Sequence, residues 1–213
     1  MKAYFFDFDG TLVDSMPLLL YAVSKQLTDA GITPPPADEL FATIIPIGYF
    51  NTAKYLVSLG IPKTAEEVLE ALYRDVAEGY LSSVPAKANA APMLAHLREQ
   101  GNSLYVLTAG APAVVGPCLE RLGLLSYFKE LLFTDSFGAM TKRESAFYRA
   151  AAARVGCPIG ECVFVDDNAE NIAAAREAGM HTIGVYDKGS DYAWGDMIKV
   201  AHRTVYDFSE LIQ

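Results

Sequence analysis

Short apolar runs alternate with stretches of helical spacing from Pro85 onward, and few folds accommodate this alternation. The apolar runs predict strands at 103–107, 131–133, 162–165, 182–185 and 204–205. The stretches between them predict helices at 91–100, within 112–122, at 145–155 and at 169–178. Pro117 lies inside the second helix, so we expect that helix to begin late or to kink. Strands joined by helices form a parallel sheet with right-handed crossovers, so the pattern indicates an α/β core.

One further apolar strand, predicted at 4–8, precedes a long block that has no strand pattern. Residues 15–83 carry apolar side chains at helical spacing, separated by breaker clusters at 31–36, 46–48 and 60–62. We therefore predict an α/β fold with a Rossmann-like parallel sheet core, residues 1–14 and 84–213, and an inserted all-helical cap domain, residues 15–83. Hinges are expected near 13–17 and 81–87.

The predicted first strand ends in two carboxylates, Asp7 and Asp9, which are followed by Gly10. In an open α/β sheet, ligands bind at the carboxyl ends of the strands. Two close carboxylates repel each other, which favours a divalent cation beside them. Taken alone, the pair is about as typical of an acidic turn after a strand.

Two polar groups follow later elements in a similar way. Thr108 follows the strand at 103–107, and with Ala109 and Gly110 it offers a hydroxyl and backbone N–H groups to phosphate oxygens. Lys142 lies between a strand and a helix, where an ammonium neutralises a phosphoryl group. Taken alone, Thr108 is a common strand-end residue and Lys142 is more typical of a solvated loop.

A second acidic pair, Asp166-Asp167, ends the apolar strand at 162–165. Carboxylate oxygens are the ligands that Mg²⁺ prefers. Because all of these groups fall in order at the ends of predicted strands or the starts of helices, together they predict one site for phosphate and a cation.

The arrangement resembles the haloacid dehalogenase (HAD) superfamily, specifically its phosphatase branch with a helical cap after the first motif, which includes phosphoglycolate phosphatases. The segment 7–15, DFDGTLVDS, matches the first motif closely. Thr108 matches the second motif, Lys142 the third, and 163–167 the fourth. The resemblance covers essentially the whole chain.

The resemblance implies hydrolysis of a small phosphate monoester, of the phosphoglycolate, sugar phosphate or nucleotide class. Asp7 would attack phosphorus and form an aspartyl phosphate. Asp9 would protonate the leaving alkoxide and then deprotonate the hydrolytic water. Thr108 and Lys142 would hold the transferring group.

The resemblance also implies a Mg²⁺ cofactor. Its expected ligands are Asp7, the backbone carbonyl of Asp9 and Asp167, with Asp166 binding directly or through a water. Asn171 stands where many relatives have another aspartate, so we do not assign it to the metal.

Two motifs depart from the pattern of the family. Ala109 replaces the asparagine that usually follows the hydroxyl of the second motif, so one phosphate or substrate contact is expected from the backbone only. Lys142 is followed by Arg143, Glu144 and Ser145, where relatives often have prolines. We keep Lys142 because the downstream spacing still fits.

The segment 44–50 reads as a proline- and glycine-containing loop with aromatic residues, between two helices of the cap. In this branch of the family, such a loop selects the leaving group. Tyr49, Phe50 and Lys54 are therefore candidate substrate contacts. An equally good alternative is that both rings pack inside the cap and that Lys54 is solvated.

The composition narrows the class of protein and its partners. A formal net charge of -9 argues against nucleic acid as the main partner, because phosphate backbones need a basic face. Three cysteines without a C-x-x-C spacing are typical of free thiols in a reducing compartment. We see no secretory signal and no apolar run long enough for a bilayer, so we expect a cytoplasmic protein without membrane contact. A monomer and a homodimer both remain open.

Three competing functions are compatible with the same motifs. A phosphosugar mutase of the β-phosphoglucomutase type would return the phosphoryl group to a sugar, and would need cap groups that hold the sugar. A dehalogenase is disfavoured because Asp9 and the acidic pair suit phosphoryl transfer. A regulatory or binding protein on an inactive scaffold is disfavoured because Asp7, Asp9, Lys142 and Asp167 are all present.

Overall fold

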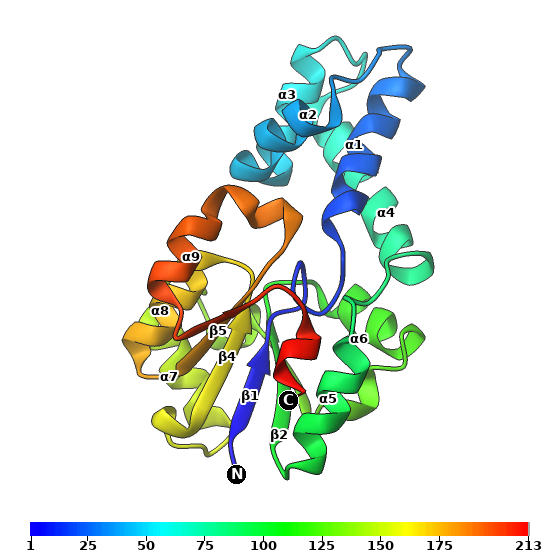
Figure 1. Ribbon diagram of the computed structural model, residues 1–213. Coiled ribbons are helices and arrows are strands. Elements are labelled where there is room, and N and C mark those ends of the chain that lie inside the picture. The colour runs from blue at the N-terminus through cyan, green and yellow to red at the C-terminus, as the bar shows by residue number, and fades with distance from the viewer. Residues whose placement is uncertain (213) are drawn as a thin grey trace. The chain divides into compact units, whose positions relative to one another are not determined.

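The computed structural model describes residues 1–212, except for the side chain of Pro46. The chain forms two compact units (Figure 1). The first unit consists of Met1–Asp14 and the segment from Pro85 onward, and the second is Ser15–Val84. The second unit thus extends one residue beyond the insertion predicted at 15–83.

The first unit contains a parallel sheet of six strands within the described residues, in the order β3-β2-β1-β4-β5-β6. The strands are β1 (Ala3–Phe6), β2 (Ser103–Thr108), β3 (Glu130–Phe133), β4 (Cys162–Asp166), β5 (His181–Val185) and β6 (Arg203–Val205). The order reverses at β1, which pairs with β2 on one side and β4 on the other. Ligands of open α/β sheets bind beyond the carboxyl ends of the strands at such a switch point.

Helices cover both faces of this sheet (Figure 1). They are α5 (Ala90–Glu99), α6 (Pro112–Arg121), α7 (Ser145–Arg154), α8 (Ala169–Ala178) and α9 (Trp194–Val200). Because neighbouring strand residues face opposite sides, a doubly covered sheet needs continuous apolar strands. All residues of β2 and β4 are accordingly buried.

The aromatic residues of the sheet show how the two faces are filled. Phe5 belongs to the core cluster that includes Tyr148 and Phe164, together with buried alanines of α7 and α8. Phe6 packs edge-on against Phe128 instead, with 6.2 Å between the ring centroids. Burial of each such ring contributes about 1.5–3 kcal/mol, so the central strands are fixed firmly by their neighbours.

The second unit is helical within the described residues. It consists of α1 (Met16–Asp29), α2 (Ala37–Ile44), a 3₁₀ turn at Ile45–Ile47, α3 (Gly48–Ser58) and α4 (Ala65–Ser82). A capping box starts α4, because Thr64 and Glu67 satisfy each other's backbone N–H groups. At Gly79 of α4, a Cβ atom would lie 2.2 Å from Cδ1 of Leu18, so glycine permits the close packing of α1 and α4.

Several sequence expectations about the elements differ from the structure. The first strand ends at Phe6 rather than at residue 8, because the carbonyl of Phe8 accepts hydrogen bonds from the amides of Leu12 and Val13 and turns the chain. The helix containing Pro117 begins at Pro112, so a late start is wrong. The expected loop at 44–50 is a 3₁₀ turn followed by the first turn of α3. Helix α9 falls where we predicted no element.

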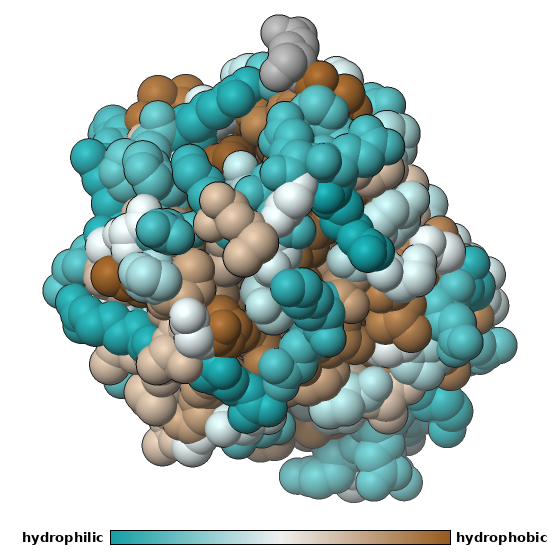
Figure 2. Space-filling view, turned by 90° about the horizontal axis from the view of Figure 1, so that it is seen from below, coloured by the Kyte–Doolittle hydropathy of each residue, from teal (hydrophilic) through white to brown (hydrophobic). Residues whose placement is uncertain are grey.

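The surface seen in Figure 2 belongs to the face toward which the amino end of β1 points. Hydrophilic side chains are interspersed there with smaller hydrophobic areas. Among the residues that the structure describes, the helices are too short or too polar to cross a lipid bilayer.

Candidate active site and cation site

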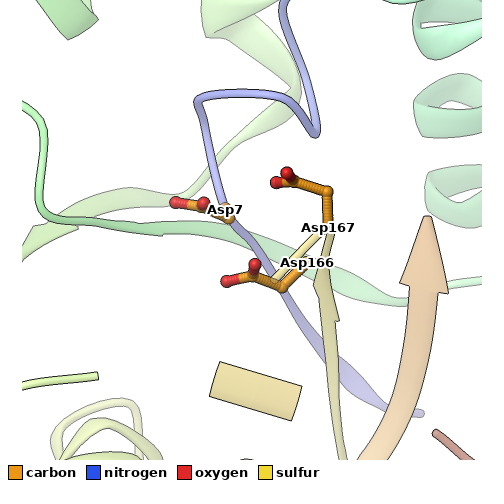
Figure 3. Close-up of side chains that lie close together, drawn as sticks. All are labelled: Asp7, Asp166 and Asp167. Atoms are coloured by element: carbon orange, nitrogen blue, oxygen red, sulfur yellow. The ribbon is translucent and has the colours of Figure 1, made fainter. Parts of the chain in front are cut away.

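Three carboxylates meet at the carboxyl ends of β1 and β4. Asp7 directly follows β1, Asp166 ends β4, and Asp167 comes next in the chain. Each offers an oxygen that lies within 4.8 Å of the other two (Figure 3). They meet because β1 and β4 are parallel neighbours and the amide of Asp7 continues the ladder to the carbonyl of Val165 at 2.9 Å.

The ammonium of Lys142 lies between two of these carboxylates. Its Nζ is 2.8 Å from Oδ1 of Asp7 and 2.7 Å from Oδ2 of Asp166. The hydroxyl of Tyr148 donates a 2.7 Å hydrogen bond to the backbone carbonyl of Lys142, which fixes the base of the side chain. Tyr148 is itself fully buried and packs on Phe164 of β4.

A tight turn presents Lys142 to the site. Glu144 accepts hydrogen bonds from the backbone amide and the hydroxyl of Thr141, both at 2.9 Å. The amide of Glu144 donates back to the carbonyl of Thr141 at 3.1 Å. The turn holds the backbone on either side of Lys142, so its position does not depend on the prolines that relatives often have.

Hydroxyl groups from two distant segments hold Asp167. Thr11 donates to Oδ1 at 3.1 Å, and its oxygen accepts the amide of Asp167 at 3.0 Å. Ser190, in the 3₁₀ helix Lys188–Ala193 after β5, donates to Oδ2 at 2.6 Å. Both carboxylate oxygens of Asp167 therefore have a fixed direction.

Both carboxylate oxygens of Asp166 have polar partners. It is fully buried, and besides Lys142 it accepts the amide of Asn168 at 2.7 Å and the side-chain amide of Asn171 at 3.1 Å. Asn168 also caps α8, because its side-chain oxygen accepts the amides of Glu170 and Asn171. The start of α8 thus fixes Asp166 in the orientation that reaches Lys142.

The electrostatics of the cluster favour a cation. Burial raises the pKa of Asp7 well above its usual range, and Asp166 and Asp167 raise it further, while Lys142 opposes them. Burial and the charge of Asp166 raise the pKa of Asp167 to about 7. Burial alone would lower the pKa of Lys142, but the charges of Asp166 and Asp7 outweigh it, so that pKa is raised. The cluster holds three carboxylates and the ammonium of Lys142 pairs with two of them, and oxygen donors suit a hard divalent cation such as Mg²⁺.

Gly10 makes room beside this cluster. Its φ is +70°, and a Cβ atom there would lie 2.6 Å from Oδ2 of Asp167. Glycine alone combines this backbone conformation with so close an approach. The acidic cluster therefore depends on the absence of a side chain at this position.

The second predicted motif lies close to Asp9. The amide of Gly110 donates to the hydroxyl oxygen of Thr108 at 2.9 Å, which leaves the Thr108 proton available to another acceptor. A Cβ atom at Gly110 would lie 3.2 Å from Oγ1 of Thr108 and 3.7 Å from Oδ2 of Asp9. The structure thus brings Asp9 and the turn at 108–110 together, with Ala109 exposed at its tip.

The cap candidates share one helix, α3, in the second unit. The ring of Tyr49 lies 5.2 Å from that of Tyr73 on α4. Phe50 is 46% exposed, and the ammonium of Lys54 lies 4.2 Å from its ring centroid. Neither ring is buried inside the second unit.

Several residues that touch the site were not assigned roles from the sequence, namely Thr11, Tyr148 and Ser190, and Asn168 and Asn171, which bond to Asp166. Thr11 lies inside the first motif, and Tyr148 lies six positions after Lys142 on one face of the following helix. Ser190 lies in a segment without apolar periodicity, and no local pattern indicates that it contacts Asp167.

Comparison with known proteins places the chain among hydrolases. A family model described as haloacid dehalogenase-like hydrolase matches residues 1–179. The phosphoglycolate phosphatase of Agrobacterium fabrum is 28% identical over 184 residues, which cover 84% of this chain and 78% of that protein. The plasmid phosphoglycolate phosphatase of Cupriavidus necator is 30% identical over 195 residues, with the same coverage of 84% and 78%.

The fold is also that of a solved structure. The crystal structure of a protein from Thermotoga maritima, assigned as a beta-phosphoglucomutase, superimposes with a TM-score of 0.83. The match covers 100% of this chain and 97% of that chain, at 21% sequence identity. At this identity the similarity establishes the fold only.

Proposed function

The chain belongs to the haloacid dehalogenase-like hydrolase family, and from this premise we propose that it hydrolyses a small phosphate monoester through an aspartyl phosphate on Asp7. One observation carries the proposal. Oδ1 of Asp7 lies 2.8 Å from the Lys142 ammonium, and the Asp7 carboxylate belongs to a cluster of three that suits a divalent cation. Phosphoryl transfer needs such charge neutralisation together with in-line positioning.

The proposed reaction has two steps. In the first, a carboxylate oxygen of Asp7 attacks phosphorus, and the P–O bond to the leaving group breaks while the carboxyl group of Asp9 donates its proton to the leaving oxygen. In the second, Asp9 accepts a proton from water as that water attacks the phosphorus of the aspartyl phosphate. Inorganic phosphate leaves, and Asp7 is restored as a carboxylate.

Two side chains are proposed to hold the phosphoryl group. Lys142 is buried and fixed by Tyr148, so its charge is in place before the substrate arrives. The hydroxyl of Thr108 has a proton to donate, because its oxygen already accepts the amide of Gly110. Backbone amides near Ala109 would add donors to the same oxygens.

We propose Mg²⁺ as the cofactor, bound by Asp7, Asp167 and the backbone carbonyl of Asp9. Asp166 is engaged with Lys142, Asn168 and Asn171, so we assign it to the cation through a water. When bound, Mg²⁺ would neutralise charge on the phosphoryl oxygens.

The relatives support the choice of substrate class to test. The two relatives named above are phosphoglycolate phosphatases, so phosphoglycolate is the first ester to test. The Ser15–Val84 unit is proposed to act as a lid that selects the leaving group. Its two ends leave the first unit side by side, since the amide of Asp14 donates to the carbonyl of Pro85 at 3.0 Å, close in sequence to Asp9.

Phosphate release from a panel of phosphate esters tests the proposal. The panel includes phosphoglycolate, sugar phosphates, nucleotides and an aryl phosphate, and sugar products are analysed for phosphoryl transfer to a second hydroxyl. We expect turnover that requires Mg²⁺ and that excess chelator removes reversibly.

The decisive variant is Asp7→Asn, which replaces the nucleophile with a neutral amide of the same shape. It should abolish turnover while the protein remains folded, whereas Asp196→Asn, at an exposed residue of α9, should leave turnover unchanged. Near-normal turnover by Asp7→Asn, with deamidation excluded by intact mass, would show that another group attacks phosphorus.

A further inference from the structure

We propose that Ser190 is a positioning residue of the cation site, and that the ion pair between Lys87 and the buried Asp187 holds the turn that carries it. The inference rests on the proposed function in one respect, because it assumes that Asp167 binds the divalent cation. The inference adds to the cation site a residue that lies outside the sequence motifs. It also gives a role to an ion pair that takes no part in the proposed reaction.

The carboxylate of Asp167 is held at both oxygens. Thr11 donates to Oδ1 and Ser190 to Oδ2, at 3.1 and 2.6 Å, from segments far apart in sequence. One hydrogen bond at each oxygen leaves a further lone pair on each for a cation. A carboxylate oriented in advance loses less conformational entropy on binding, and outer partners of this kind commonly change metal affinity about 10–100-fold.

The position of Ser190 depends on Asp187. The side chain of Asp187 accepts the amide of Gly189 at 2.7 Å, and its carbonyl accepts the amide of Ser190 at 3.0 Å. Asp187 therefore caps the 3₁₀ helix Lys188–Ala193 and aims the hydroxyl of its third residue at Asp167.

Lys87 holds Asp187 in turn. The Asp187 side chain is 2% exposed, and its Oδ2 pairs with the ammonium of Lys87. The backbone amide of Lys87 donates to the carbonyl of Leu12 at 2.9 Å, in the loop that carries Thr11. A buried carboxylate needs a compensating partner, so this ion pair fixes the two segments relative to each other.

These contacts close a ring around one side of Asp167. The ring runs from Asp167 to Thr11, through its neighbour Leu12 to Lys87, then to Asp187, and through Ser190 back to Asp167. Thr11 and Ser190, the two hydroxyl donors to Asp167, are thus held by one frame, which consists of these hydrogen bonds and the ion pair of Lys87 and Asp187. The frame gives a role to the buried carboxylate of Asp187, which lies outside the sequence motifs.

A direct metal-binding measurement tests the role of Ser190. Mn²⁺ binding to the whole protein, followed by the loss of the free-ion electron paramagnetic resonance signal, needs neither substrate nor turnover. Ser190→Ala should weaken Mn²⁺ binding about tenfold, and Ser190→Thr, which keeps the hydroxyl, should restore it to within about threefold. If Ser190 served only the stability of the fold, Ser190→Ala would lower the melting temperature, and its loss of Mn²⁺ affinity would follow that loss of stability. We expect the melting temperatures of both variants to match that of the wild type while their Mn²⁺ affinities differ.

Ser209→Ala is the matched control. Ser209 lies in another 3₁₀ helix capped by an aspartate, Asp207, which accepts the backbone amide of Ser209, and this helix lies outside the acidic cluster. Removal of the Ser209 hydroxyl should leave Mn²⁺ binding unchanged. Ser190→Ala with the affinity of the wild type would overturn the inference alone. No Mn²⁺ binding by the wild type would overturn both the inference and the proposed cofactor.

A double-mutant cycle tests the path from Asp187. Asp187→Asn should weaken Mn²⁺ binding in the wild type and have little further effect in the Ser190→Ala background. Full additivity of the two changes would show that Asp187 does not act through Ser190. Thermal unfolding establishes that each variant is folded, and the Ser190 variants keep the inference testable if Asp187→Asn does not fold.

Discussion

The ammonium of Lys142 lies 2.8 Å from Oδ1 of Asp7 and is nearly sequestered from solvent. The same ammonium is 2.7 Å from Oδ2 of Asp166. One cation therefore offsets part of the repulsion within a buried acidic cluster, in the position where the proposed reaction needs positive charge. Loss of this contact is therefore expected to affect both the stability of the fold and the proposed reaction.

Replacing Lys142 with methionine should destabilise the protein by about 3–5 kcal/mol in the absence of divalent cations, because buried carboxylates lose their partner. Added Mg²⁺ should restore more stability to this variant than to the wild type, since it supplies the missing positive charge. Turnover should fall about 10²–10³-fold even with Mg²⁺ present. Urea unfolding with chelator and with Mg²⁺ measures the first two effects.

Lys199→Met is the control for that experiment. Lys199 pairs with Asp196 on the surface, where both side chains are more than two-thirds exposed, so its loss should cost at most about 1 kcal/mol. Equal responses of both variants to Mg²⁺ would argue against a shared charge balance between Lys142 and the cation.

Replacing Asp9 with asparagine should lower turnover about 10²–10⁴-fold, because the amide cannot transfer the proton. Mn²⁺ affinity should change less than about threefold, since only the backbone carbonyl of Asp9 is proposed as a ligand. Initial rates and the Mn²⁺ resonance titration, made on the same preparation, separate the two roles. Loss of metal binding as the main effect would make Asp9 a side-chain ligand instead.

Replacing Gly10 with alanine should remove cation binding and activity together. The new methyl group would lie 2.6 Å from Oδ2 of Asp167, and the φ of +70° would add about 1–2 kcal/mol of strain. Gly123→Ala isolates the strain, because Gly123 has the same φ of +70° but no heavy atom within 4 Å of an added Cβ. It should lose stability only, as thermal unfolding and metal titration would reveal. Normal Mn²⁺ affinity in Gly10→Ala would contradict the steric argument.

Replacing Tyr49 and Phe50 with alanine should alter the relative kcat/KM values across the panel of esters, while hydrolysis of a small aryl phosphate changes much less. The reason is that α3 presents an exposed ring with a lysine ammonium above it, which suits contact with a leaving group. Tyr21→Ala, at a 62% exposed ring on α1, is the control. A uniform loss on every substrate would instead indicate a packing role through Tyr73.

The sequence by itself determined the parallel sheet and indicated which polar residues lie at its carboxyl edge. The apolar runs at 4–8, 103–107 and 162–165 carry a carboxylate or a hydroxyl group at their carboxyl ends, and the carboxyl ends of parallel strands converge on one edge. The meeting of Asp7, Asp166 and Asp167 could therefore be predicted without coordinates. Lys142 was harder to place, because the prolines usual after it are absent and a turn between Thr141 and Glu144 holds it instead.

Only the tertiary structure revealed what orients these residues. The partners of Asp167 lie 156 and 23 positions away along the chain, and Lys87 lies 100 positions from Asp187. Neither helical nor strand periodicity carries information about contacts at such separations, because they depend on how completed elements pack. The position of Ser190 in a short 3₁₀ helix illustrates this: its local pattern is that of a surface turn, and its role arises only where β5 lies beside β4.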